Sequence, residues 1–530
     1  MRFILNLKKL NKFITAPHFK IEDMKIALKL LTRSCFMTKI DLKDGYFLIP
    51  VHKKHKKYLR FSFRGVLYEF NAIPFGLSTA PYLFTKLVKP VVAWLRQKGF
   101  KSVVYLDDFL MIGTSREECS ENARETKNLL ESLGLIINYE KSNFEPSHQC
   151  EFLGFILDSK KYLIYLTNKK RESIEKITRR LAKQKTEQIR EVAKVIGTLV
   201  SACPGVQYGW LHTKNLEREK VLALHKNWGN FDKSMTISDE AKIDLKWWYE
   251  NIQRSFNIIR DHRYTLEIFT DASLTGWGAF CRNQKAHGWW GKQTDASINA
   301  LELEAAFNGL KCFAKNQSHC EILMRIDNTT AISYVNKMGG IRYPKLSKIA
   351  RDIWKWCEER KIHIFASYIN TKENTEADAE SRKLPPETEW QLAEWAFSEI
   401  VKQFGKPKID LFASSLNAKC KHFISWKKDP ESIGVDAFTF SWKNLDFYAF
   451  PPFSLILRVL QKIIAEEAEG IVIVPYWPTQ PWYPAFKALS KNSYITFEPD
   501  ITLLSSPFSS EHPLSRKLTL VAARLSGKHT

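Results

Sequence analysis

The pattern of apolar and polar positions predicts alternating strands and helices in the first part of the chain. Residues 37–50 predict a strand that meets a turn at Asp44-Gly45. Residues 101–113 are apolar apart from two adjacent aspartates, and they predict a pair of strands that is broken at those aspartates. Residues 80–99 carry apolar side chains at helical spacing, and residues 115–134 predict a helix that begins at the N-cap residue Ser115. We expect a strand-helix-strand-helix order around a mixed sheet.

The pattern changes several times further along the chain. Residues 168–255 predict mainly helices, and the stretch YTLEIFTDASLTGWGAF predicts a hairpin, followed by alternating helices and strands. A Pro-rich break, KLPPETEW, precedes a last unit that is less basic and richer in Trp, and the end from SSPFSSEHPLSRKLTL onward is expected to be poorly ordered. These changes predict domains at residues 1–165, 166–260, 261–383 and 384–500, with a tail at 501–530.

Charge adds a candidate partner to this picture. The 530 residues carry a formal charge of +23, and residues 1–383 hold nearly all of it, because residues 384–530 contain 16 Lys and Arg against 15 Asp and Glu. An excess of this size predicts a polyanionic partner, with a generally basic protein as the alternative. The run VHKKHKKYLR either contacts template phosphates or forms a solvated charged hairpin.

Cysteine usage and hydropathy exclude several classes of protein. The nine cysteines are scattered, with no CxxC pair and no His cluster at zinc spacing. No apolar run approaches the roughly 18 residues of a spanning helix, and the N-terminus MRFILNLKKLNKF lacks a small-residue cleavage pattern. We expect an intracellular protein, cytoplasmic or nuclear, that binds no membrane.

Three carboxylates form the first candidate site. Asp107 and Asp108 lie inside the apolar stretch VVYLDDFLMIG, and Asp41 ends an earlier strand. The segment between the two strands is long enough to let them lie side by side, which would bring the three acids together. Divalent cations would then relieve the mutual repulsion of the carboxylates. Two such ions, about 3.5–4 Å apart, activate an attacking oxygen and stabilise a leaving one. Phosphoryl-transfer chemistry follows from these residue types.

Residues 1–165 resemble reverse transcriptases over five ordered blocks. These are TKIDLKDGYFLIPVH, NAIPFGLSTAPYLFTKL, YLDD, LGLIINYEKSNF and CEFLGFIL. The resemblance implies a right-hand polymerase with palm, fingers and thumb, an RNA template, a DNA primer and dNTPs as partners, and Mg²⁺, or Mn²⁺ in its place, as two ions per active site. Asp41, Asp107 and Asp108 then form the metal-binding triad of the palm, with Asp107 and Asp41 as the direct ligand pair and Asp108 more distant.

The same resemblance implies nucleotide and primer contacts. Tyr46 matches the aromatic position under the incoming sugar, and Phe75 with Gly76 matches the loop that packs on the nucleotide; aromatic core is the alternative for both rings. Further matches are Lys141 near the pyrophosphate, with a solvated lysine as its alternative, the triphosphate-contacting Arg2, and the primer-grip turn Phe152, Leu153 and Gly154. The fingers begin later than is usual in this family, so we expect them to be N-terminally incomplete.

Four further acids resemble the Asp-Glu-Asp-Asp set of ribonuclease H across residues 264–383. They are Asp271, Glu302, Asp327 and Asp378, and Asn328 and Ser273 either support them or serve as turn residues. The resemblance implies two Mg²⁺ ions and hydrolysis of the RNA of RNA–DNA hybrids. Tyr368, in YINTKEN, stands where related sequences carry a histidine, so histidine-assisted product release is not expected.

The arrangement as a whole resembles DIRS-like, tyrosine-recombinase retrotransposons. This implies a separately encoded tyrosine recombinase as partner and, over residues 408–484, a Dam-like N6-adenine methyltransferase domain. Phe450 replaces the Asp or Asn that accepts hydrogen bonds from the target amine before Pro451 and Pro452, so we expect this domain to be inactive.

The expected fold class is α/β and α+β in several domains, with a ribonuclease H-like mixed sheet and a Rossmann-like methyltransferase-type domain. The expected function is RNA-directed DNA polymerase with ribonuclease H. The alternative is a domesticated or decayed nucleic-acid-binding protein that keeps the folds without polymerase activity.

Overall fold

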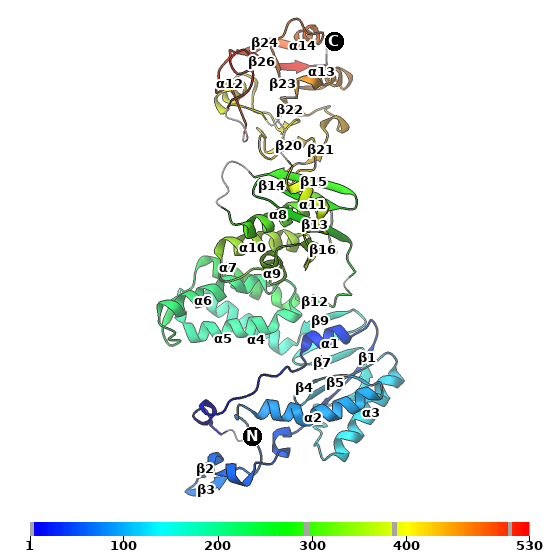
Figure 1. Ribbon diagram of the computed structural model, residues 1–530, viewed down its shortest axis with the longest axis vertical. Coiled ribbons are helices and arrows are strands. Elements are labelled where there is room, and N and C mark those ends of the chain that lie inside the picture. Colours follow the sequence, from blue (N-terminus) through cyan, green and yellow to red (C-terminus); the bar gives the residue numbers. More distant parts are fainter. Residues whose placement is uncertain (1–4, 262, 291–295, 384–389, 507–510, 529–530) are drawn as a thin grey trace. The chain divides into compact units, whose positions relative to one another are not determined.

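The computed structural model describes residues 5–261, 263–290, 296–383, 390–506 and 511–528 (Figure 1). The chain divides into two compact units, Met1–Asp261 and His262–Thr530. Within the described ranges, no helix combines the length and apolar character needed to cross a membrane.

The first unit is built on a sheet with the order β4-β5-β1-β6. Every neighbouring pair in it is antiparallel, so the expectation of a mixed sheet here is wrong. The physical reason is the two-residue turn between β4 and β5, which reverses the chain and places β5 directly beside β1. The strands are β1 (Phe36–Asp41), β4 (Lys101–Tyr105), β5 (Asp108–Gly113) and β6 (Asn143–Ser147).

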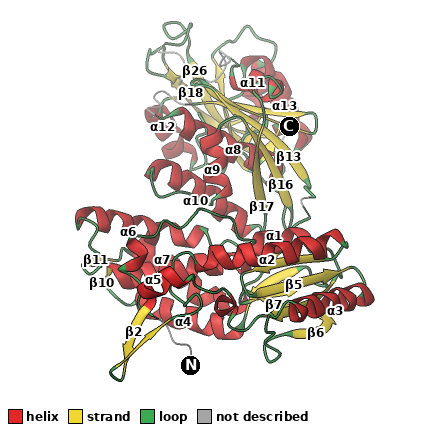
Figure 2. Cartoon of the chain, turned by 60° about the horizontal axis from the view of Figure 1, so that its bottom comes forward, coloured by secondary structure: helices red, strands yellow, loops and turns green. Residues whose placement is uncertain are grey.

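Two helices, α2 (Ala80–Gln97) and α3 (Arg116–Ser132), pack on one face of this sheet, where Ile40 and Phe109 are fully buried (Figure 2). Both helices were predicted from the sequence. Ser115 caps α3 as expected, because its Oγ accepts the Glu118 amide at 3.1 Å. The strand predicted to meet a turn at Asp44-Gly45 ends at Asp41, and a 3₁₀ helix over Gly45–Leu48 follows the position of the predicted turn.

The remainder of the first unit comprises a hairpin, a second sheet and a helical region. The charged run predicted as a hairpin or phosphate contact is a 3₁₀ helix over Lys53–Leu59 that leads into the exposed hairpin β2-β3. The second sheet has the order β12-β9-β8-β7, and the helices α4 to α7 bury Leu199 and Trp248 beside it. The elements are α1 (Met24–Leu30), β2 (Arg60–Phe63), β3 (Val66–Glu69), β7 (Gln149–Phe152), β8 (Phe155–Asp158), β9 (Leu163–Leu166), α4 (Asn168–Ala182), β10 (Thr186–Gln188), α5 (Ile189–Ala202), α6 (Lys214–Lys226), β11 (Ser234–Thr236), α7 (Asp239–Asn251) and β12 (Asn257–Ile258).

The second unit begins with a mixed sheet of order β15-β14-β13-β16-β17. Strand β14 pairs antiparallel with both β15 and β13, whereas β13, β16 and β17 run parallel to one another. Helices α8, α9 and α10 lie beside the sheet in Figure 2, and α11 packs on β14. The elements are β13 (Leu266–Ala272), β14 (Gly276–Cys281), β15 (Gln284–Trp289), α8 (Ile298–Ala314), β16 (Glu321–Ile326), α9 (Thr329–Asn336), α10 (Pro344–Glu359), β17 (His363–Tyr368) and α11 (Thr375–Ser381).

A larger sheet follows, with the order β21-β20-β19-β22-β23-β26-β24. Its strands are parallel except for β26, which pairs antiparallel with both of its neighbours. The elements are β18 (Gln391–Leu392), α12 (Glu394–Phe404), β19 (Ile409–Asp410), β20 (His422–Ser425), β21 (Gly434–Val435), β22 (Asp446–Ala449), α13 (Ile456–Ala465), β23 (Glu469–Pro475), α14 (Tyr483–Leu489), β24 (Ser490–Phe497), β25 (Leu504–Ser505) and β26 (Leu520–Ser526).

The prediction that the chain is poorly ordered from Ser505 onward is wrong for β26. Strand β26 lies inside the sheet, and Leu520, Val521 and Ala522 are buried. A strand covered on both faces is apolar at consecutive positions and lacks the alternation that marks an exposed strand. The polar SSPFSSEHP segment before it obscured this short apolar run.

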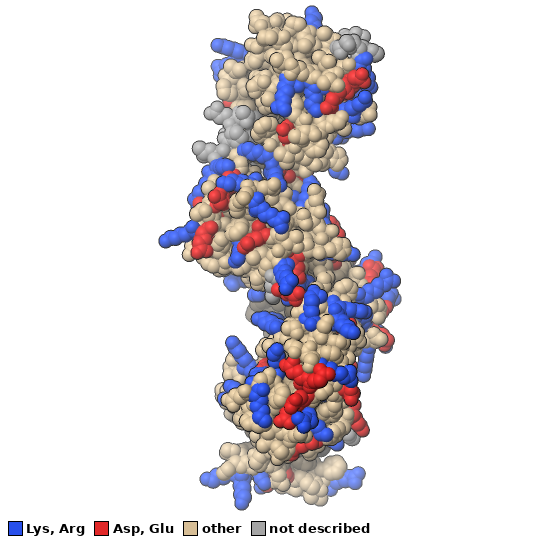
Figure 3. Space-filling model, turned by 90° about the vertical axis from the view of Figure 1, so that its right-hand side faces the viewer, with Lys and Arg blue, Asp and Glu red and all other residues tan. Residues whose placement is uncertain are grey.

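Basic side chains are spread over the surface. Figure 3 shows Lys and Arg distributed across the visible face of both units, with groups of Asp and Glu between them. The excess of +23 is therefore not gathered in one stripe on this face.

Candidate functional site

The three acids predicted for the palm lie at one end of the first sheet. Asp41, the last residue of β1, is directly opposite Asp108, the first residue of β5, so their side chains share a face. Asp107 is in the turn before β5, and its carbonyl accepts the Leu42 amide at 2.9 Å. The turn residue Leu106 has φ +55°, a left-handed conformation that is costly for a bulky side chain. The face that carries Asp41 and Asp108 is opposite the one covered by α2 and α3, because Ile40 and Phe109 point to those helices.

Polar neighbours fix two of these acids. Asn138 Nδ2 donates to Asp41 Oδ1 at 2.9 Å, and the Asp41 amide donates to Ser142 Oγ at 3.0 Å. Lys39 Nζ lies 2.9 Å from Asp108 Oδ1, and these side chains are 18% and 22% exposed. Burial alone would lower the pKa of Lys39, but the hydrogen bond and charge of Asp108 outweigh it and raise the pKa. Asp108 is therefore compensated by Lys39 within the sheet.

Two of the predicted nucleotide contacts meet in an aromatic cluster. The Tyr46 ring centroid is 5.1 Å from that of Phe75 and 5.6 Å from that of Phe84. Asn11 braces the loop that carries Phe75, because its Nδ2 donates to the Gly76 carbonyl at 2.8 Å. Gly76 has φ +99°, which favours glycine at this position.

The other predicted nucleotide contacts lie elsewhere. Lys141 is exposed and is next to Ser142, which bonds the Asp41 amide. Arg2 lies outside the described residues.

The predicted primer-grip residues form the turn between β7 and β8. Leu153 and Gly154 both have positive φ, +50° and +75°, as in a two-residue hairpin turn of type I′. Phe152 is fully buried, and Lys170 Nζ donates to the Leu153 carbonyl at 3.4 Å. A Cβ on Gly154 would lie too close to the Lys170 side chain. The positive φ of Gly154 favours glycine at this position of the turn.

Three acids of the second unit converge. Asp271, Glu302 and Asp327 each offer a carboxylate oxygen, and these oxygens lie within 4.8 Å of one another. Among the described residues this is the only such group of three, so Asp41, Asp107 and Asp108 are not gathered as closely. Asp271 is near the end of β13, Glu302 is in α8, and Asp327 follows β16. Asp271 and Glu302 are each 3% exposed.

Close packing of α8 on β13 brings Glu302 to the strand. A Cβ on Gly309 of α8 would lie 2.8 Å from the Thr270 methyl group, so the glycine permits the approach.

Burial, followed by the charges of Asp271 and Asp327, raises the pKa of Glu302 to about 9. Burial also raises the pKa of Asp271 to about 6, against the hydrogen bond from Ser381. Glu302 Oε2 is buried and has no hydrogen-bond partner. An orphaned oxygen in a group of acids with raised pKa values fits a divalent cation, which prefers oxygen ligands.

The fourth predicted acid, Asp378, is outside the group of three. It lies in α11, where Arg382 Nε and Nη2 donate to its Oδ1 at 2.9 and 2.7 Å. Ser381, on the same helix, donates from Oγ to Asp271 Oδ2 at 2.6 Å. Helix α11 is thus tied to the cluster through Ser381, whereas Asp378 is neutralised by its own neighbour.

The two supporting residues named from the sequence take structural roles. Asn328 caps α9 by accepting the Ala331 amide at 2.9 Å, and its Nδ2 donates to Asn299. Ser273 Oγ donates to the Ser381 carbonyl at 2.6 Å and so helps to hold α11. Thr371 Oγ1, which the sequence analysis did not single out, donates to Asp327 Oδ2 at 2.9 Å.

Basic and hydroxyl side chains beside the acids were missed from sequence. Lys39 is two residues from Asp41, which in a strand places both side chains on one face. Arg382 is four residues after Asp378, a helical spacing that favours an ion pair. Both signals were therefore present in the spacing.

The candidate site in the last sheet lacks the expected acceptor. Phe450 follows β22 and is partly buried against apolar residues, 6.4 Å from the Phe453 ring centroid. Asp410, at the end of β19, accepts the amides of Phe412 and Lys419 at 3.2 and 3.1 Å. Burial raises the pKa of Asp410 to about 6 against these bonds. Its oxygens thus brace the loop that follows.

The first part of the chain matches a known protein family. Residues 1–157 match the family described as reverse transcriptase (RNA-dependent DNA polymerase). Over 160 residues the chain is 29% identical to the Transposon Tf2-3 and Tf2-4 polyproteins and 28% identical to the Tf2-7 polyprotein of Schizosaccharomyces pombe. The match covers 30% of this chain and 12% of each polyprotein, so the chain matches only a small part of their length.

Solved structures with similarity include two of the foamy viral protease-reverse transcriptase. One, the dRH form in complex with double-stranded DNA, has a TM-score of 0.43 at 18% identity and covers 73% of this chain and 63% of that chain. The other, in complex with an RNA/DNA hybrid, has a TM-score of 0.42 at 18% identity, with 73% and 52% covered. On the family match and the polyprotein similarity, residues 1–157 carry a reverse transcriptase domain of the kind found in retrotransposon polyproteins.

Proposed function

We propose that the chain is an RNA-directed DNA polymerase with a linked ribonuclease H, which copies retrotransposon RNA and hydrolyses the RNA of the resulting hybrid. The observation that carries the second activity is the convergence of Asp271, Glu302 and Asp327 within 4.8 Å. The reverse transcriptase match over residues 1–157 supports the first. RNA template, DNA primer, dNTPs and RNA–DNA hybrid are the partners that these activities require.

In the palm, the residues supply positions for metal ions and nucleotide. When bound, two Mg²⁺ ions would activate the primer 3′ oxygen and stabilise the pyrophosphate that leaves. Asp41 and Asp107 would hold them, and Asn138 keeps the Asp41 carboxylate oriented. Tyr46, packed against Phe75, would lie under the incoming sugar and exclude a 2′-hydroxyl. Lys141 would offer a cation to the leaving group.

In the second unit, the strand order and the acids support ribonuclease H together. The sheet β15-β14-β13-β16-β17 presents Asp271 from its central strand and Asp327 from the neighbouring one, and α8 adds Glu302. Without a cation, the raised pKa of Glu302 keeps a proton on the cluster at neutral pH. Two Mg²⁺ ions would replace that proton and bind the hybrid phosphate, with Asp378 as the further ligand once it leaves Arg382.

Primer extension tests the polymerase. The full chain with an RNA template, a DNA primer, dNTPs and Mg²⁺ should extend the primer, and Asp107→Asn should abolish extension because it removes a ligand charge. Asp44→Asn is the matched control: Asp44 lies three residues beyond Asp41 with φ +54°, a conformation that Asn tolerates. Equal extension by Asp107→Asn and the parent chain would contradict the assignment.

A decayed protein that binds nucleic acid without turnover is the second candidate. One observation favours this second candidate. Among the described residues, the carboxylates of the palm acids do not converge as closely as those of the second unit. Hybrid binding with neither extension nor cleavage, in Mg²⁺ and in Mn²⁺, would establish it in place of the enzyme.

For the last sheet we propose an inactive methyltransferase-type domain of a DIRS-like element, whose integration would fall to a separately encoded tyrosine recombinase. The order β21-β20-β19-β22-β23, with antiparallel β26, supports the Rossmann-like type. Phe450 cannot accept a hydrogen bond from a target amine, and the carboxylate of Asp410 is engaged by backbone amides. Methyl transfer from S-adenosylmethionine to DNA should be undetectable, and clear incorporation would overturn the proposal.

A further inference from the structure

One loop of the last sheet lies against β15 of the sheet that carries the acidic cluster. In this loop, which connects β20 to β21, Lys427 Nζ is 2.9 Å from His287 Nε2, and Lys428 Nζ donates to Gln284 Oε1 at 2.8 Å. Lys427 also lies 5.3 Å from the ring centroid of Trp289. His287, Gln284 and Trp289 all belong to β15.

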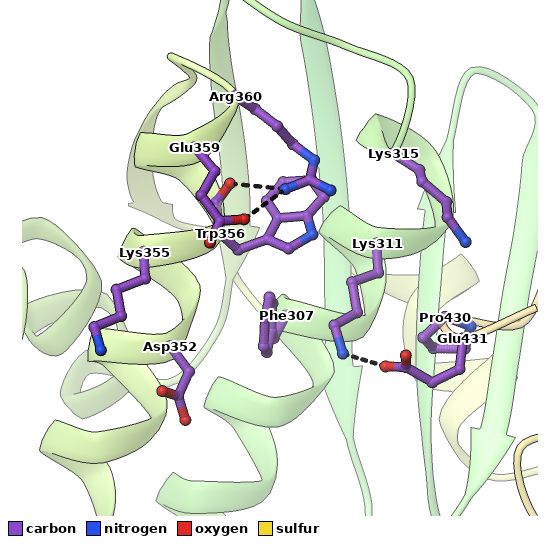
Figure 4. A pocket seen from close by; sticks show the side chains of 10 residues that line it. All are labelled: Phe307, Lys311, Lys315, Asp352, Lys355, Trp356, Glu359, Arg360, Pro430 and Glu431. Carbon is purple, nitrogen blue, oxygen red and sulfur yellow. Dashed lines mark hydrogen bonds and ion pairs between the residues drawn. The ribbon is translucent and has the colours of Figure 1, made fainter. Parts of the chain in front are cut away.

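The same loop contacts α8. Lys315 Nζ donates to the Ser432 carbonyl at 2.7 Å, and Lys311 pairs with Glu431. A pocket of about 400 Å³ lies beside this contact, and Figure 4 shows Lys311 directed at Glu431 and Arg360 paired with Glu359 over the Trp356 ring. The basic and acidic side chains that line the pocket largely balance in charge, so the pocket does not suit an anion, and we interpret it as part of the contact between the loop and α8. The lining residues are Phe307, Lys311, Lys315, Asp352, Lys355, Trp356, Glu359, Arg360, Pro430 and Glu431.

Behind Lys427, the contact continues into the protein. His287 Nδ1 lies 2.7 Å from Glu380 Oε2, and these side chains are 8% and 2% exposed. An ammonium group only donates, so Nε2 accepts from Lys427, and the ring proton of the neutral imidazole is on Nδ1, the nitrogen that faces the Glu380 carboxylate. Burial, followed by the charge of Lys427, lowers the pKa of His287, in agreement with a neutral ring.

Glu380 belongs to α11, the helix that flanks the acidic cluster. The next residue, Ser381, donates to Asp271 Oδ2 at 2.6 Å. Asp378 lies two residues before Glu380 on the same helix. The helix is seven residues long and packs on β14, where a Cβ on Gly278 would lie 2.2 Å from the Ala377 carbonyl. So short a helix depends on tertiary contacts for its stability and position.

We propose that the loop between β20 and β21 positions α11, and with it Ser381 and Asp378, through Lys427 and His287. The last sheet would then serve the ribonuclease site as a positioning element, with no chemistry of its own. This role rests on the proposed ribonuclease H activity, but the contact itself can be tested without that activity.

Hydrogen exchange of the α11 amides, residues 375–381, in the metal-free full chain measures the contact directly. Loss of a charge-assisted hydrogen bond worth about 1.4 kcal/mol to the closed helix corresponds to about tenfold faster exchange. We expect that change in Lys427→Gln. Lys428→Gln is the matched control, because it removes the neighbouring charge and leaves His287 and Glu380 untouched. Unchanged exchange in Lys427→Gln, or equal acceleration in the control, would overturn the proposal.

Two variants of His287 separate positioning from packing. His287→Gln can still accept from Lys427 and donate to Glu380, whereas His287→Leu can do neither. We expect α11 exchange near that of the parent chain in the first and faster exchange in the second. The Mg²⁺ concentration for half-maximal hybrid cleavage should rise several-fold in Lys427→Gln and not in Lys428→Gln. If Glu302→Gln left cleavage intact, the proposed ribonuclease function would fail, yet the exchange result would still decide the contact.

Discussion

The two acidic sites of this protein are built differently. In the first unit, Asp41 and Asp108 lie on a sheet face that α2 and α3 do not cover, and Lys39 compensates Asp108. In the second unit, Asp271 and Glu302 are buried, converge with Asp327 and have raised pKa values.

This difference lies in how each site holds its negative charge before a cation binds. The first site balances an acid with a lysine of the adjacent strand and keeps its carboxylates apart. In the second site the acids are buried together, which raises the pKa values of Glu302 and Asp271 and so favours their protonated forms. Oxygen ligands grouped in this way suit a divalent cation. Cation binding is therefore expected to change the stability of the second unit more than that of the first.

The largest expected effect separates the sites by activity. Glu302→Gln should lower hybrid cleavage by about a thousandfold or more, because a neutral amide is a far weaker Mg²⁺ ligand, while primer extension stays unchanged. Glu304→Gln is the control, because Glu304 is on the same helix and its pKa is raised by burial and not by neighbouring acids. Joint loss of both activities in a folded Glu302→Gln chain would show that the sites are not separate.

The next effect concerns stability and pH. A carboxyl group whose folded pKa is raised costs stability as pH rises above its unfolded value, so Glu302 should destabilise the metal-free second unit progressively between about pH 4.5 and pH 9. Each kcal/mol corresponds to a melting-temperature change of about 2–4 °C for a unit of this size. In EDTA, the melting temperature of the parent chain should fall from pH 6 to pH 9 more than that of Glu302→Gln, and Mg²⁺ should restore it. If the melting temperatures of the parent chain and of Glu302→Gln changed equally with pH, Glu302 would not be the source of the pH dependence, and the proposed electrostatic difference between the two sites would be contradicted.

A smaller effect is expected at the first site. Lys39→Met should destabilise the first unit by about 1–2 kcal/mol, because it leaves Asp108 partly buried without its cation. Asp108→Asn should relieve much of this loss in the double variant. Chemical denaturation of the four proteins gives the coupling energy, and strict additivity would mean that the ion pair does not compensate Asp108.

The smallest effect concerns Ser381. Its hydrogen bond lowers the pKa of Asp271, so Ser381→Ala should raise that pKa further and reduce hybrid cleavage several-fold near pH 6. The pH–rate profile should shift to higher pH on its acidic limb and approach the parent rate at higher pH. A uniform loss at every pH would indicate that Ser381 acts on helix position alone.

Much of the local structure followed from the sequence. The helices α2 and α3, the strand pair β4-β5 and the hairpin β13-β14 were predicted because their apolar spacing and caps are local signals. The antiparallel first sheet and the buried strand β26 were not, since strand order and burial depend on contacts far apart in the sequence.

The sequence by itself determined which acids are available and the order in which they occur. It specified Asp41, Asp107 and Asp108 on apolar strands, and Asp271, Glu302, Asp327 and Asp378 in the second set, because motifs and periodicity are read along the chain. Only the tertiary structure decided which of them meet and which are neutralised. Asp378 is paired with Arg382 and Asp108 with Lys39, whereas three other acids converge. Packing sets those distances and burial sets the pKa values, and both arise only when strands and helices from distant parts of the chain come together.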